Sequence, residues 1–407
     1  MLESHMLNKY KPVILQFCIC LMLTFASLAD ETAQITFALT LAENTHFISM
    51  LLSTGLLCGI LANFSAPLLL HQFGAYRLII NIFYIESLLI VIAAFMGSFW
   101  AYICLAAGLG SVLALLWSAV MVAIPDFAQN EHQLDWINRV VQTMRNFGYI
   151  GGPILGSLFF TYLQHSYGLI YLAILVLCAG FIVLLCFNLL KINNIKQTKN
   201  EHLPHSTKKY LDFIGLFKKK TVFWVLLPLV ITIAFSSAEN VMLIIYIRKI
   251  LQFDATSYGW ILSSTSIGLV VGPLLFTGFF KILGEAPGAC LAAAGIGTGI
   301  FCLSLTSNIW VIIISSLLIG ISNGVQNTLM ATFMMNNIKK DERKQQMPAY
   351  IFIVQSSVLA GFFSAGFIAL DYIQISLTII GIMTILAGCT GIIANLYQQK
   401  FKPKSNL

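Results

Sequence analysis

Charge is what this 407-residue sequence has least of. Only 10% of its residues are charged, whereas 58% are hydrophobic and the mean hydropathy is +0.86. A typical soluble domain carries about 25% charged residues, so the composition excludes an ordinary soluble fold and predicts a membrane protein. The sequence also has no phosphate-binding Walker loop and no hydrolytic motif. We therefore expect neither ATP-driven activity nor an enzyme.

Signals for metal binding and for a removable leader are both missing. The nine cysteines lie within apolar runs, and none has a histidine at metal-ligand spacing. Their predicted role is small apolar packing, so we expect no metal and no cofactor. The first apolar run, residues 12–28, is followed by polar residues rather than by a small-residue cleavage site. It is therefore interpreted as a retained first helix.

The net charge of +7 is explained by topology. Lysine and arginine gather before the first apolar run, in the central polar stretch 191–220, in 339–344 and at the end of the chain, whereas only Arg248 and Lys249 clearly fall on the opposite side. This asymmetry follows the positive-inside rule and places both termini and the central stretch in the cytoplasm, for a protein of the bacterial inner membrane. Nucleic-acid binding is not needed to explain the charge.

Twelve segments are long and apolar enough to cross a hydrocarbon core, which takes roughly 20 residues per helix. They are residues 13–40, 46–70, 77–97, 100–124, 137–163, 167–190, 222–247, 257–281, 287–306, 309–335, 348–370 and 374–397. The fold class is therefore an all-α membrane protein. Its domains are a six-helix bundle at 1–190, a cytoplasmic linker at 191–221 and a second six-helix bundle at 222–407. Within the linker, residues 208–218 have the pattern of a short amphipathic helix on the membrane face.

The two halves repeat at one constant offset. Pairs of identical residues lie 210 positions apart at Gly74 and Gly284, Ser53 and Ser263, Trp100 and Trp310, Gly110 and Gly320, Gly151 and Gly361, and Gly156 and Gly366. A parallel six-plus-six repeat, related by an axis along the membrane normal, is the construction of transporters whose halves rock about a central site.

A glycine stripe marks the fifth predicted span. Gly148, Gly152 and Gly156 recur every four residues, so they share one helix face and allow another helix to approach closely. Pro153 removes a backbone donor within this stretch. The face is either generic helix packing or a hinge or seal between moving halves. We favour a seal that packs against the span 257–281, near Gly268 and Gly272.

These patterns resemble the major facilitator superfamily over essentially the whole length. The closest similarity is to its drug:proton antiporter branch, which includes macrolide-efflux and enterobactin-exporter-like proteins. Four stretches carry the resemblance, namely 27–31, 138–142, 258–262 with its following glycines, and 148–157, which is similar to the antiporter motif Gly-x-x-x-Gly-Pro-x-x-Gly-Gly. The loop at 67–77 departs from the family pattern, because His71 replaces the usual aspartate. The charged latch of that loop is therefore not preserved.

Ionisable residues within membrane spans are costly and are functional candidates by default. Asp30 and Glu31 lie in the first predicted span, Glu239 lies at a nearly equivalent place in the seventh, and Glu86 lies in the third. Resemblance to the family implies that the first, fifth and seventh spans line the central cavity and that the third is more peripheral. Glu86 is accordingly the weaker candidate. The alternative for each acid is a hydrogen-bonded helix contact.

Three polar residues complete the predicted pathway. Arg145 lies in the fifth span, where it binds an anionic substrate group or neutralises an acid, while Gln34 and Asn240 lie within a helical turn of the acids. Desolvation favours the neutral form of a carboxylate, so a buried acid can exchange a proton as water access alternates.

The sequence thus predicts a monomeric, proton-coupled secondary transporter that exports a small molecule. Its expected partners are that substrate, protons and the lipid bilayer, with no nucleic acid. A nutrient importer for amino acids or sugars, and a non-transporting membrane protein of the same fold, remain as alternatives.

Overall fold

The computed structural model of the chain describes residues 2–96, 98–123, 131–189, 213–218, 220–338 and 342–400. All regular secondary structure in this part of the chain is helical. Ten of the described segments are long and apolar enough to cross a membrane, and α1 and α5 complete the set of twelve. The predicted all-α fold with twelve transmembrane helices is confirmed.

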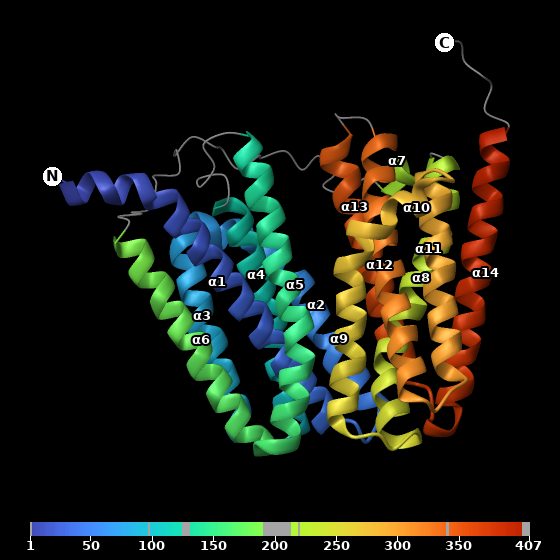
Figure 1. The fold of residues 1–407 in the computed structure, drawn as a ribbon, viewed down its shortest axis with the longest axis horizontal. Coiled ribbons are helices and arrows are strands. Elements are labelled where there is room, and N and C mark those ends of the chain that lie inside the picture. Colours follow the sequence, from blue (N-terminus) through green and yellow to red (C-terminus); the bar gives the residue numbers. More distant parts are fainter. Residues whose placement is uncertain are drawn as a thin grey trace, which may run out of the picture. The chain divides into compact units, whose positions relative to one another are not determined.

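Six long helices form the first half of the chain, coloured blue to green in Figure 1. They are α1 (Leu2–Thr40), α2 (Thr45–Phe73), α3 (Ala75–Phe95), α4 (Phe99–Ala123), α5 (Glu131–Tyr162) and α6 (Gln164–Leu189). The helix α5 continues through Pro153 without interruption.

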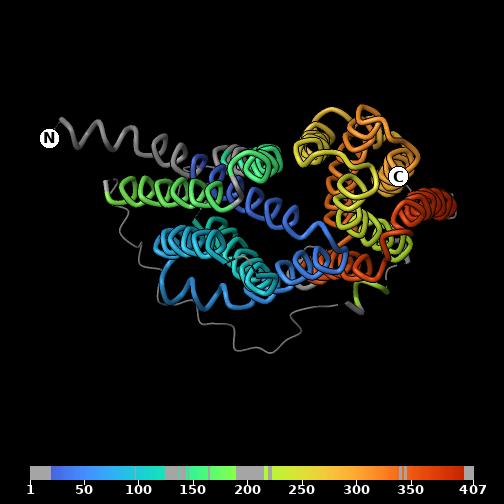
Figure 2. The backbone as a smooth tube through the Cα atoms, turned by 90° about the horizontal axis from the view of Figure 1, so that it is seen from below, coloured from blue at the N-terminus to red at the C-terminus, as the bar shows by residue number. Residues whose placement is uncertain are grey.

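Six further spans form the second half, and Figure 2 shows several of them nearly end-on. The elements are α7 (Phe213–Lys218), α8 (Lys220–Ile245), η2 (Tyr246–Ile250), α9 (Ala255–Val271), η3 (Gly272–Phe276), α10 (Thr277–Lys281), α11 (Glu285–Ser304), α12 (Ile309–Asn337), α13 (Arg343–Ala365), η4 (Leu370–Tyr372) and α14 (Ile373–Lys400). The elements η2 and η3 are π-helical turns that continue α8 and α9, so that α9, η3 and α10 form one span. The span predicted at 348–370 ends earlier, at Ala365, because a turn begins at Gly366.

The packing divides the chain into two compact units. The first contains Met1–Leu41 with Met50–Leu203, and the second contains Ala42–Ser49 with Pro204–Leu407. Within the second unit, the Ser49 hydroxyl donates a hydrogen bond of 2.7 Å to the Phe362 carbonyl oxygen. Large apolar side chains such as Phe64, Trp100 and Trp310 are exposed on the outer surface of their helices. Lipid contact accounts for this exposure, which would be unusual in a soluble protein.

The repeat inferred from the sequence is present in the helix boundaries. The helices α2, α3 and α4 begin at residues 45, 75 and 99, and α9, α11 and α12 begin at 255, 285 and 309, so each pair differs by 210 (255 − 45, 285 − 75, 309 − 99). Gly74 and Gly284 precede α3 and α11 with φ angles of 75° and 101°. This left-handed backbone is one that glycine adopts without steric cost. The same tight turn is therefore built twice.

The two repeat-related turns differ in charge. The Lys281 ammonium lies 3.4 Å from a Glu285 carboxylate oxygen, and the same carboxylate accepts hydrogen bonds of 3.0 Å from the Asn336 amide. In the first unit, His71 and Ala75 occupy the positions of Lys281 and Glu285. The second turn therefore has a polar tie to α12 that the first turn cannot form with these side chains.

Only part of the predicted linker helix lies in the described chain. The helix α7 covers Phe213–Lys218, and its Leu216 is fully buried against the apolar core that includes Val222 and Leu226. It packs against α8 and α13. This short helix is therefore anchored in the second unit by Leu216.

Asp254 caps the N-terminus of α9 in the loop after η2. Its side chain accepts hydrogen bonds from the Ser257 backbone N–H at 3.0 Å and from the Thr256 and Ser257 hydroxyls. Partial burial raises the pKa of Asp254, but these hydrogen bonds and the charge of Arg248 outweigh it and lower the pKa below its ordinary value of 3.8. The ionised form of Asp254 therefore stabilises the start of α9.

Candidate functional site

The helix α1 carries the first group of predicted site residues. Asp30 is buried, with 2% of its surface exposed, whereas Glu31 and Gln34 are half-buried. The Gln34 amide donates a hydrogen bond of 2.7 Å to Oδ2 of Asp30, as expected for two polar residues one helical turn apart. Within the described chain, Oδ1 of Asp30 is buried and has no hydrogen-bond partner.

The glycine stripe of α5 faces α1 at the level of these acids. A Cβ atom on Gly148 would lie 2.6 Å from the Leu28 backbone nitrogen, and one on Gly156 would lie 2.9 Å from the Thr32 carbonyl oxygen. A Cβ atom on Gly152 would overlap the Cβ atom of Glu31. The absence of side chains therefore brings the backbones of α1 and α5 together, next to Asp30 and Glu31.

The predicted seal between this stripe and the span 257–281 stays a prediction, and what the structure shows is the packing of glycines within each unit. In the second unit, Gly268 and Gly272 are buried against α12, where added Cβ atoms would lie 2.6 Å from the backbone nitrogen and 2.9 Å from the Cα of Ile321. Each stripe thus packs a pair of helices within its own unit. Close approach needs glycine wherever two helices pack backbone to backbone, so the spacing could not identify the partner helix.

Glu239 is the buried acid of the second unit. It lies on α8 with 3% of its surface exposed, while its neighbour Asn240 is exposed. The helix α13 packs closely on α8, because a Cβ atom on Gly361 would lie 2.8 Å from the Cβ atom of Ser237. Gly361 is the repeat equivalent of Gly151 on α5. The pairing of α13 with α8 therefore matches the pairing of α5 with α1.

Two further candidates differ in what the structure shows of them. Glu86 on α3 is buried, with 3% of its surface exposed, although the third span was expected to be peripheral. Its Oε1 atom has no hydrogen-bond partner in the described chain. Arg145 lies in the helical range of α5, but its side chain lies outside the described residues. The structure therefore adds an argument for Glu86 and none for Arg145.

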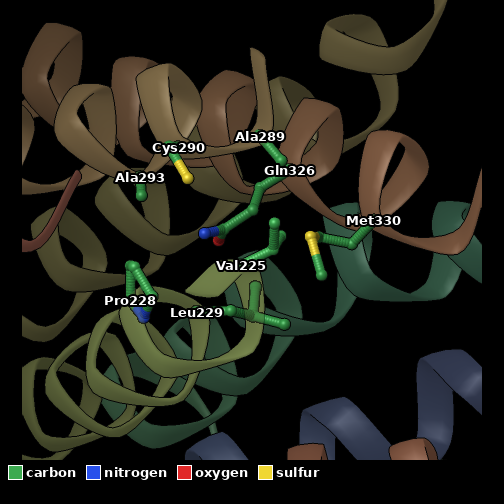
Figure 3. Close-up of a pocket in the computed structure, with 8 residues that line it drawn as sticks. All are labelled: Val225, Pro228, Leu229, Ala289, Cys290, Ala293, Gln326 and Met330. Carbon is green, nitrogen blue, oxygen red and sulfur yellow. The ribbon is translucent and has the colours of Figure 1, made fainter. Parts of the chain in front are cut away.

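A group of mainly apolar residues in the second unit surrounds the gap shown in Figure 3. The lining residues are Val225, Pro228, Leu229, Ala289, Cys290, Ala293, Gln326 and Met330. Figure 3 shows the buried Gln326 amide pointing into their midst. The gap is too narrow to admit a water molecule, so it is a packing defect and not a substrate site. Among the described residues, no cluster of three or more histidine, cysteine or acidic side chains could hold a metal ion.

Comparison with known proteins identifies the class of this molecule. The model of the Major Facilitator Superfamily matches residues 19–362 and 229–406. The chain belongs to this superfamily, which is a family of transporters rather than of enzymes. No curated protein sequence matches the chain significantly.

Solved structures of several transporters share the fold. A bacterial homologue of the human lysosomal transporter Spinster is 12% identical with a TM-score of 0.70, over 97% of this chain and 99% of that one. The nucleoside transporter NupG is 15% identical with a TM-score of 0.69, over 96% and 99%. The peptide transporter POT, in complex with sulfate, is 12% identical with a TM-score of 0.71, over 94% of each chain. At these identities the likeness establishes the fold alone.

Proposed function

We propose that the chain is a proton-coupled secondary transporter of the bacterial inner membrane, which exports a small molecule by alternating access. The observation that carries this proposal is the burial of one acid on the first long helix of each unit. Asp30 on α1 and Glu239 on α8 are exposed by only 2% and 3%. A buried carboxylate is costly in a membrane protein and is characteristic of proton relays.

The positions of the two acids follow the repeat. Asp30 lies 10 residues before the end of α1 at Thr40, and Glu239 lies 11 residues before the end of η2 at Ile250. At about 1.5 Å per residue, each acid lies roughly 15 Å from the end of its span. Equivalent depth in both units is the arrangement expected of groups that gain and lose water access as the halves move.

The direction of transport rests on the resemblance of the α5 stretch to the antiporter motif. In the structure, this stretch holds α1 at the level of Asp30 and Glu31. The glycines leave few side chains to interlock between α1 and α5. Such a contact suits helices that shift against each other during exchange. We therefore favour proton-driven export over symport, with the chain acting as a monomer.

Flux through proteoliposomes under an imposed proton gradient tests this function. The probes are a macrolide and a catechol siderophore for export, with an amino acid and a sugar for import. We expect gradient-dependent movement of an export probe, and its loss in Asp30→Asn and in Glu239→Gln. The matched controls, Glu43→Gln and Asp371→Asn, each remove an exposed acid and should transport normally.

Gradient-independent flux, or unchanged coupling in both buried-acid variants, would refute the role of these acids. Movement of an import probe down the proton gradient, with none of an export probe, would replace export by nutrient uptake. Failure of every probe to move would favour a non-transporting member of the fold.

A further inference from the structure

Glu86 shares two unusual properties with Asp30. Both side chains are at least 97% buried, and each keeps one carboxylate oxygen, Oε1 or Oδ1, without a hydrogen-bond partner in the described chain. Buried polar atoms are nearly always hydrogen-bonded, so an unsatisfied one requires an explanation. A proton on such an oxygen removes the charge that makes its burial costly.

The two acids lie at matching depth on helices that run in the same direction. The helix α2 returns the chain between α1 and α3, so the ends of α1 at Thr40 and of α3 at Phe95 lie on the same side of the unit. Asp30 precedes Thr40 by 10 residues and Glu86 precedes Phe95 by 9, which at 1.5 Å per residue gives depths of about 15 Å and about 14 Å.

The helices that carry the two acids share a neighbour. Both α1 and α3 pack against α6, and the hydroxyl of Ser87, next to Glu86, donates a hydrogen bond of 2.9 Å to the Ala173 carbonyl oxygen on α6. Asp30 and Glu86 therefore lie at one level of the unit, on helices that both pack against α6.

The surrounding helices offer little compensating charge. The helix α4 contains no acidic residue, lysine, arginine or histidine over its whole length, and its Tyr102 packs against Phe37 of α1. The one basic residue of α3, Arg77, is exposed and lies nine positions from Glu86. On α5 and α6 the side chains of Arg145 and His165 lie outside the described residues. The remaining acid nearby is Glu31, which is half-buried beside Asp30.

We propose that Asp30 and Glu86 form a coupled carboxyl pair that holds a proton within the first unit. Two like charges at short range in a medium of low dielectric constant do not ionise together, and an isolated buried carboxylate is costly. The pair therefore keeps one proton while the other exchanges with water. The inference rests on the proposed function only in assigning this proton to the coupling of transport.

The pair is a feature of one unit. The residue 210 positions after Glu86 is Ile296 on α11, which is 1% exposed. In place of a second acid the repeat thus has an apolar side chain, and Glu239 has no equivalent partner on α11. The first unit can therefore bind two protons in separate steps where Glu239 binds one.

Infrared titration of the purified full-length chain in detergent tests the pair without any substrate. The carbonyl band of protonated carboxylic acids, identified by its shift in deuterated buffer, is followed from about pH 4 to pH 10. All variants carry Glu239→Gln so that the pair is observed alone. We expect the buried acids to titrate in two steps separated by more than about one pH unit, the behaviour of coupled groups.

The single variants distinguish coupling from independent titration. Asp30→Asn and Glu86→Gln should each retain the lower step and lose the upper one, because the upper step exists only when the neighbouring acid is already ionised. Glu43→Gln, which removes an exposed acid, should keep both steps. The isosteric amides keep the fold, which a single symmetric size-exclusion peak verifies.

Two results would overturn the inference. One is a parent titration that equals the sum of the two single variants, since the acids would then act independently. The other is loss of both steps when sodium replaces potassium, since the oxygens would then bind a cation. If the titration steps are coupled but transport does not depend on the proton gradient, the carboxyl pair is supported and the proposed function is refuted.

Discussion

Replacement of Gly152 by alanine gives the sharpest test of how α5 positions α1. The added Cβ atom would overlap the Cβ atom of Glu31 and would lie 3.2 Å from the Thr32 backbone nitrogen. These atoms belong to or adjoin the α1 backbone, so a side-chain rotation cannot relieve the overlap and the helix must move. Overpacking of this kind typically costs about 1–3 kcal/mol.

The neighbouring Gly151 provides a matched control. Its added Cβ atom would meet only Cδ1 of Leu28, at 2.9 Å, and the tip of a leucine can rotate away. Both substitutions gain the same helix propensity, at most about 1 kcal/mol, so their difference isolates the clash. We expect Gly152→Ala to be about 1–3 kcal/mol less stable than Gly151→Ala.

Unfolding of the purified variants in mixed detergent micelles, followed by tryptophan fluorescence as the denaturing detergent is increased, measures this difference. Gly151→Ala should match or exceed the wild type, and Gly152→Ala should fall below it. Equal stability of the two variants would show that α1 does not contact α5 through Gly152, and would remove the argument that the stripe positions Glu31.

Two further predictions concern the second unit. Gly272→Ala should destabilise the chain by about 1–3 kcal/mol because its Cβ atom would lie 2.9 Å from the Ile321 Cα atom. The control Gly278→Ala should not destabilise it, because an added Cβ atom there would have no atom within 4 Å. Equal melting temperatures of the two variants would contradict the packing of α9 on α12. Asp254→Ala should cost about 0.5–2 kcal/mol at neutral pH through loss of the helix cap. Because the pKa of Asp254 is lowered in the folded state, this contribution is present above the ordinary aspartate value and is lost as pH falls through the folded value. The difference in melting temperature between wild type and Asp254→Ala should therefore shrink in acid. A difference that grows in acid would show that the ionised form of Asp254 does not stabilise the start of α9.

Much of the fold could be predicted from the sequence because membrane helices are defined by length and apolarity alone. The offset of 210 predicted the repeat, which the structure shows in the helix starts and in the positive φ of Gly74 and Gly284. The first span was predicted to begin at residue 13, but α1 begins at Leu2. Local apolarity could not predict that a polar N-terminal stretch continues a helix.

The candidate site could be predicted less fully, because a residue's neighbours across helices are not encoded in spacing. The glycine stripe was predicted as a close-packing face, but its spacing could not show that these glycines pack against α1. The similar depth of Asp30 and Glu86 appears only when both are counted from the ends of their helices, which the structure supplies. Burial of Glu86 on a helix expected to be peripheral required the packed structure.

Substrate-driven proton movement tests the central claim most directly. Proteoliposomes that contain a trapped pH-sensitive dye are given a gradient of the macrolide or siderophore probe and no initial pH difference. We expect protons to move opposite to the probe in the wild type and in Glu43→Gln, and this movement to be lost in Asp30→Asn and in Glu239→Gln. Probe flux with no change in the dye signal, or proton movement that persists in both buried-acid variants, would contradict it.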